Sequence, residues 1–173
     1  MTERDVVQQH IRQWERERPD LSFGAMATFA RLGRLAAVAG PMIAETFSRH
    51  ELNIGEFDVL AALRRSGEPF VLTPSTLAKA MMLSTAAMTN RLDRLQAAGL
   101  VDRRLDPENR RSILVSLTAA GRTTVDAAVV EHVANEESLL AGLTAGQRQT
   151  LDDLLATLLA SLEGPTRSDR PTL

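Results

Sequence analysis

Hydrogen-bonding and cationic side chains gather in the middle of the chain, on one predicted helix and at one predicted hairpin. On the helix over residues 84–98, Met88, Leu92 and Leu95 share one face and form a core seam. The opposite side and its flanks carry small or hydrogen-bonding residues, which are the types that read base edges in a DNA major groove. The residues assigned to this DNA-facing side are Ser84, Thr85, Thr89, Asn90 and Arg94.

Two runs with strand character, residues 100–105 and 112–117, follow this helix and predict a hairpin. Arg110 and Arg111 are adjacent in its turn, and two arginines at a hairpin tip suit insertion into a narrow, electronegative minor groove. Asp106 is expected to brace either guanidinium through a bidentate contact. The alternative interpretation is a charged turn in solvent.

A second set of residues could bind a small planar anion, which needs a cation, an aromatic wall and a hydrogen-bond partner. Arg91 lies about 60° from the core seam, and therefore beside the core rather than on the DNA-facing side. Asp58 is the polar residue within an otherwise apolar run over 57–63. If that helix is buried all round, Asp58 needs a cationic partner or a bound polar group; the alternative is a thin solvent-facing stripe.

The elements that must position these residues read as a winged helix-turn-helix. Thr73 is expected to cap a short helix that starts at Pro74, and Ser84 to cap the next. In the C-terminal part, Thr144 and Gln147 form a predicted capping box. The last helix then carries a leucine stripe at helical spacing, made of Leu151, Leu154, Leu155, Leu158 and Leu162. We expect this stripe to pair with a second copy of the chain.

Composition excludes several classes of protein. The 173 residues carry a net charge of −2, with 44% hydrophobic residues and no cysteine, which excludes disulfides and thiolate metal sites. We expect no metal, no cofactor and no enzyme, because no catalytic triad, phosphate loop or metal cluster is visible. Without a long apolar run or a signal segment, we expect a cytoplasmic protein.

Charge is unevenly distributed along the chain. Residues 79–111 hold seven basic and four acidic side chains, whereas residues 112–173 hold four basic and eight acidic ones. A basic middle and an acidic end are consistent with one face that meets phosphate. A helical adaptor with no DNA-binding role remains an alternative, although an adaptor would not need a wing.

The order of elements resembles the MarR family of winged-helix transcriptional regulators over residues 22–163. The motif that carries this resemblance runs from Asp106 to Gly121, D-P-E-N-R-R-S-I-L-V-S-L-T-A-A-G, and is similar to that family's wing and the helix start after it. The resemblance implies a mainly α-helical fold with a small β-wing, dimerised through its N- and C-terminal helices. It also implies a regulator, expected to be a repressor, that binds a pseudo-palindromic DNA operator.

A finer resemblance is to the urate-responsive, PecS-like branch, which has an extra N-terminal helix. Four residues match that branch: Trp14 on the first helix, Asp58 before the helix-turn-helix, Arg91 in the recognition helix and Arg103 at the start of the wing. Arg104 leaves the last register open. The implied effector is a small anion, with urate as one candidate; a phenolic, antibiotic or carboxylic acid ligand is the alternative. Trp14 could instead simply dock its helix.

The implied organisation has five parts. These are an extra N-terminal helix (1–20), a dimerisation helix and loop (21–54), the winged helix-turn-helix (55–117), C-terminal dimerisation helices (118–163) and a disordered tail (164–173).

Overall fold

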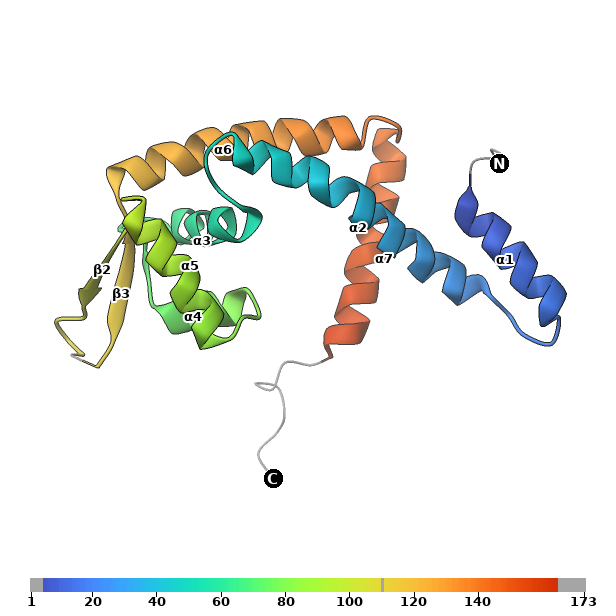
Figure 1. Ribbon diagram of the computed structural model, residues 1–173, viewed down its shortest axis with the longest axis horizontal. Helices are drawn as coiled ribbons and strands as arrows, with labels where there is room; N and C mark the ends of the chain where they lie inside the picture. Colours follow the sequence, from blue (N-terminus) through green and yellow to red (C-terminus); the bar gives the residue numbers. More distant parts are fainter. Residues whose placement is uncertain (1–4, 110, 165–173) are drawn as a thin grey trace, which may run out of the picture. The chain divides into compact units, whose positions relative to one another are not determined.

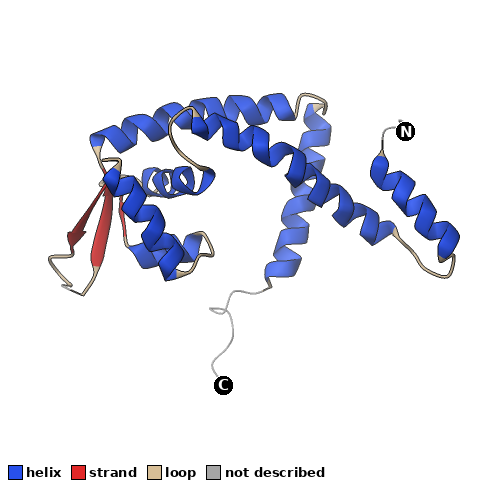
Figure 2. Ribbon diagram, in the orientation of Figure 1, coloured by secondary structure: helices blue, strands red, loops and turns tan. Residues whose placement is uncertain are grey.

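The protein is mainly helical, with one small antiparallel sheet, in a computed structural model that describes residues 5–109 and 111–164 (Figure 2). This confirms the predicted fold class. Most of the predicted tail lies outside the described residues. The elements in chain order are α1 (Val6–Glu17), α2 (Gly24–Ser48), α3 (Ile54–Arg65), β1 (Val71–Leu72), α4 (Pro74–Ala80), α5 (Thr85–Ala97), β2 (Val101–Leu105), β3 (Ile113–Leu117), α6 (Ala119–Leu139) and α7 (Ala145–Glu163).

The chain divides into two compact units, and the boundary falls after Val133, within α6. The first unit holds α1 to α5, the sheet and most of α6, and the second holds the end of α6 and α7. Over the described residues, no helix combines the length and the apolar character needed to cross a membrane.

The helix-turn-helix forms because both of its helices begin at predicted caps (Figure 1). The Thr73 hydroxyl accepts the N–H of Thr76 at 3.2 Å, with Pro74 at the first helical position. The Ser84 hydroxyl accepts the N–H of Ala87 at 3.3 Å. Each cap satisfies an N–H that a helix start leaves without an intrahelical partner.

The wing is the β2–β3 hairpin, which runs in register from Val101↔Leu117 at its base to Leu105↔Ile113 near its tip. Residues Val71–Leu72 add a third strand, so the sheet order is β1-β3-β2 with antiparallel pairing throughout. Val101 and Val115 are fully buried, and they fix the base of the wing in the core.

The main core lies between α3, α4, α5, the sheet and α6. Met88, Leu92 and Leu95 are each 1% exposed, which confirms the predicted seam of α5. They pack in one cluster with Phe47, Leu60, Leu63, Leu77, Val125 and Ala128. A separate small cluster of Val7, Ile11, Phe23 and Ala27 packs α1 on the start of α2.

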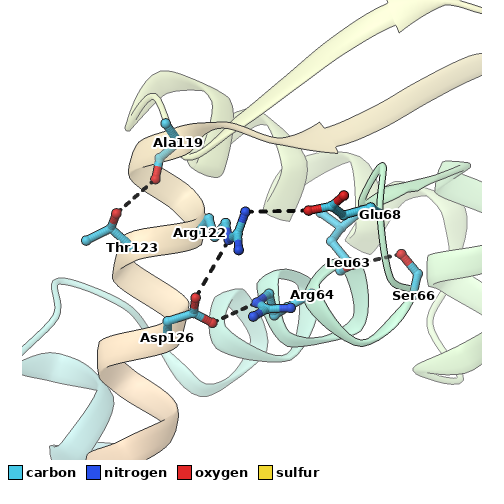
Figure 3. A network of polar contacts seen from close by, with 8 residues as sticks. All are labelled: Leu63, Arg64, Ser66, Glu68, Ala119, Arg122, Thr123 and Asp126. Carbon is cyan, nitrogen blue, oxygen red and sulfur yellow. Dashed lines mark hydrogen bonds and ion pairs between the residues drawn. The ribbon is translucent and has the colours of Figure 1, made fainter.

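A network of charged side chains joins α3 and the turn after it to the start of α6 (Figure 3). Arg64 on α3 pairs with Asp126 at 2.7 Å, while Arg122 lies 3.9 Å from both Asp126 and Glu68. The guanidinium carbons of Arg64 and Arg122 each lie 5.1 Å from the centre of the Phe70 ring, within cation–π range. The helix α3 and the turn after it are therefore tied to α6 by charge as well as by packing.

Candidate nucleic-acid interface and ligand hollow

The outer side of α5 is polar and exposed, as the sequence predicted. Thr85, Thr89, Asn90 and Arg94 are exposed, opposite the buried seam. The Thr89 hydroxyl donates to the Thr85 carbonyl at 3.0 Å, and the Ser84 hydroxyl is occupied as the helix cap. The Thr89 oxygen therefore keeps its acceptor capacity, while Asn90 can both donate and accept at a base edge.

Arg94 is held by a residue that the sequence did not single out. Its Nε lies 2.7 Å from Oε1 of Glu56, at the start of α3. The Arg94 side chain nevertheless stays 60% exposed, whereas that of Glu56 is 10% exposed. The structure thus pairs one edge of the guanidinium and leaves the rest at the surface.

The tip of the wing carries Arg111, which is exposed and whose backbone N–H donates to Oδ1 of Asn109 at 3.2 Å. Arg110 lies outside the described residues. Asp106 does not form the predicted pair with Arg111, because its Oδ1 accepts the N–H of Glu108 at 3.0 Å instead. Asp106 therefore shapes the turn through the backbone, as aspartate often does two residues before an N–H.

A hollow of about 290 Å³ lies between α3, the end of α4 and α5. It is lined by Asp58, Ala62, Arg65, Ala80, Met81 and Arg91. Arg91 is half-buried, and its Nη1 donates to the carbonyl of Gly55 at 3.3 Å. Two cations and one carboxylate thus share a small concave site, an arrangement that suits a small anion with a donor group.

Asp58 corrects the expectation of a buried carboxylate, since its side chain is exposed on the outer stripe of α3. The residues on either side of it, Phe57 and Val59, are buried, so the stripe is only one residue wide here. Partial desolvation raises the pKa of the Asp58 carboxyl above its usual value, while the charges of Arg91 and Arg65 act in the opposite direction.

The structure does not bring all four predicted ligand residues together. Trp14 is 48% exposed and stacks on Phe23, with 6.0 Å between ring centroids, so it docks α1 on the start of α2. Arg103 pairs with Asp93, and its Nε donates to Gln96 at 2.5 Å, so it holds the wing against α5. Neither is among the described residues that line the hollow.

Arg65 and Glu56 are the residues that sequence reasoning missed. Arg65 follows Asp58 by seven residues, two helical turns, and so lies on the same side of α3. That spacing alone could have predicted that Arg65 lies beside Asp58. Glu56 stands third after the cap Asn53, where the sequence indicates a capping box but not a partner on α5.

Residues 50–112 match the model of the MarR family. The chain is 39% identical over 132 residues to the HTH-type transcriptional regulator PecS of Dickeya dadantii (strain 3937), which covers 76% of this chain and 77% of PecS.

Solved structures of DNA-binding regulators also match this chain. A mutant of MarR from E. coli in complex with operator DNA matches with a TM-score of 0.69 and 27% identity, over 79% of this chain and 97% of that one. BpsR of Bordetella bronchiseptica, whose structure describes regulation of DNA binding by 6-hydroxynicotinic acid, matches with a TM-score of 0.67 and 27% identity, over 76% and 91%. These relatives are regulators and not enzymes, in agreement with the prediction from sequence.

Proposed function

Because this chain belongs to the MarR family of transcriptional regulators, we propose that it is a repressor that binds a pseudo-palindromic operator as a homodimer. The exposed polar side of α5 carries this proposal. A solved relative binds operator DNA, and this chain exposes hydrogen-bonding side chains on α5, the second helix of its helix-turn-helix. In the proposed complex α5 enters the major groove with Thr85, Thr89 and Asn90 at base edges, and Ser84 lies close to the backbone.

The wing would reach the neighbouring minor groove with Arg110 and Arg111. Half-sites about one helical turn apart would match the twofold symmetry of the dimer. Dimerisation is supported by apolar side chains that remain exposed on α2, α6 and α7 in the single chain. The most exposed of these are Phe29, Leu35, Val38, Val130, Val133, Leu154, Leu159 and Leu162.

A DNA duplex selected by the wild-type protein from a random library provides the test. We expect enrichment of a pseudo-palindrome. If no duplex is enriched, the proposed function fails, because a protein of this kind must discriminate its operator from other sequences.

Arg111→Ala should weaken binding to that duplex and flatten its salt dependence. A cation that meets phosphate releases about 0.9 of a counterion, so the slope of log affinity against log salt should fall by about one per protomer. Fluorescence anisotropy at several salt concentrations measures both effects. Arg12→Ala removes the same charge from the exposed side of α1 and should leave the slope unchanged. Equal slopes for wild type and Arg111→Ala would remove the wing from the interface.

We further propose that a small anionic effector binds in the hollow of Asp58, Arg65 and Arg91 and lowers the affinity for DNA. Arg91 belongs to the recognition helix, whereas the other two residues belong to α3. An effector bound by Arg91 and by the two α3 residues at the same time would therefore pull α5 to a new position relative to α3, which loss of the Arg91 side chain alone would not do. A coupling of about 1–3 kcal/mol would change operator affinity roughly five- to 150-fold.

The effector we favour is a planar anion of the urate type, with a phenolic, antibiotic or carboxylic acid as the alternative. The relative regulated by 6-hydroxynicotinic acid supports an effector that is planar and acidic, but it does not favour one particular molecule. Trp14 and Arg103 stay predictions as ligand residues; they would join this hollow only after moving from their present partners.

Arg91→Ala should keep the DNA affinity within about threefold and lose the effector response, since it removes one of the two cations from the hollow. The measurement is release of labelled duplex on titration with urate, xanthine and simple phenolic and carboxylic acids. Arg12→Ala is the control, because Arg12 is exposed on α1 and does not line the hollow, so the effector response should stay unchanged. If Arg91→Ala abolishes DNA binding before any effector is added, Arg91 is a structural or DNA-contacting residue instead.

A further inference from the structure

We propose that Glu56 is a positioning residue for DNA binding, which holds Arg94 so that the outer edge of its guanidinium meets a backbone phosphate. This inference rests on the proposed function. It assigns a role to a buried acid whose part in the capping box of α3 does not account for its contact with Arg94.

The Glu56 side chain is held in place by contacts at the start of α3, independently of Arg94. Its Oε2 accepts the N–H of Asn53 at 2.9 Å, and its own N–H donates to Oδ1 of Asn53 at 3.0 Å, which completes a capping box. The residue is only 8% exposed.

Arg94 is therefore paired at one end and open at the other. Oε1 of Glu56 lies 2.7 Å from Nε of Arg94, and no other described residue forms an ion pair with Arg94. The two terminal nitrogens of the guanidinium remain to donate, and a guanidinium carries enough N–H groups in fixed directions to serve two acceptors. Arg94 also follows Asn90 by four residues, so both lie on the same side of α5.

The neighbouring residue makes the same junction rigid. The Gly55 carbonyl accepts from Arg91, and a Cβ at Gly55 would lie 2.4 Å from Cζ of Arg91. The first turn of α3 thus contacts two arginines three residues apart on α5. An arginine fixed in this way loses less side-chain freedom when it meets DNA than a free one does.

One substitution can raise or lower DNA affinity, and the direction of that change separates a positioning role of Glu56 from simple repulsion between its charge and the DNA. A carboxylate near the DNA repels phosphate, so removal of its charge alone should strengthen binding. If Glu56 positions Arg94, Glu56→Gln should weaken binding instead, although the protein becomes less negative. Glutamine keeps an oxygen for the Asn53 N–H, so the capping box of α3 can persist.

The experiment compares Glu56→Gln, Arg94→Ala and the double variant on the duplex selected by the wild type. We expect Glu56→Gln to bind roughly three- to tenfold more weakly, in line with the loss of one immobilised side chain. The double variant should bind like Arg94→Ala alone, because Glu56 acts through Arg94. Tighter or unchanged binding by Glu56→Gln, or an undiminished loss in the Arg94→Ala background, overturns the proposal.

Arg94→Lys gives a second test that leaves Glu56 in place. Lysine keeps the charge, but its three N–H groups share one nitrogen, and a contact with Glu56 would hold that nitrogen at the α3 side, away from the phosphate. We expect its affinity to resemble that of Arg94→Ala, and wild-type affinity would show that only the charge matters. If the wild type itself enriches no duplex, the proposed function fails; if it does and these variants bind normally, only the role of Glu56 fails.

Discussion

Leu154→Glu is expected to convert the proposed dimer into a monomer and to weaken operator binding by more than about 100-fold. Among the described residues of α7 none is buried, and Leu154 is 64% exposed in the single chain. A charge on that face would have to be buried without a partner in the proposed interface, at a cost of several kcal/mol. The loss in DNA affinity follows because two linked half-site contacts typically exceed one by 10²- to 10⁴-fold.

Sedimentation at micromolar protein measures the first effect, and anisotropy with the selected duplex measures the second. Ala160→Glu is the matched control. Ala160 is exposed and lies six residues along α7 from Leu154, on the other side of the helix, so the same added charge should leave the dimer intact. A Leu154→Glu variant that remains dimeric would place the interface elsewhere.

Gly121→Ala is expected to destabilise the fold by at least about 3 kcal/mol, because the added methyl group collides with the main chain. A Cβ at Gly121 would lie 1.9 Å from the carbonyl oxygen of Leu100, just after α5. The backbone there cannot yield easily, since Thr118 donates its hydroxyl to the Gly99 carbonyl at 2.8 Å and its N–H to the Leu100 carbonyl at 3.2 Å.

Thermal unfolding followed by circular dichroism provides the measurement, and a drop of several degrees in Tm is expected. Gly146→Ala serves as the control, because it lies in the first turn of α7 with no atom within 4 Å of the added Cβ. That change should be neutral or slightly stabilising. Similar Tm values for both variants would mean that α6 can shift away from Leu100 at little cost.

The same contact explains why the sequence motif around Thr118 and Gly121 indicates this fold. Thr118 accepts the N–H of Gly121 at 2.9 Å and so caps α6, while Gly121 allows the helix start to approach the end of α5. Local signals of this kind, caps and apolar periodicity, predicted α4, α5, the wing and the inward face of α5 correctly. Each depends on residues that are close in sequence.

The partners of the arginines could not be predicted in this way. Arg94 pairs with Glu56, and Arg103 contacts α5, because the tertiary fold brings these side chains together from separate elements. The burial of Asp58 was also ambiguous, since one exposed position on an otherwise buried helix leaves almost no trace in periodicity. Composition and spacing predicted which surfaces carry the polar residues, but not which side chains form ion pairs there.

The stacking of Trp14 on Phe23 gives this protein a built-in optical reporter. The chain holds one tryptophan and no tyrosine, so its intrinsic emission originates at the junction of α1 and α2. A shift of this emission therefore reports a change in the surroundings of Trp14 at that junction. By contrast, an effector that binds only in the proposed hollow of Asp58 and Arg91 should release DNA without changing the tryptophan emission. The emission spectrum therefore distinguishes an effector that acts at the junction of α1 and α2 from one that acts at the hollow.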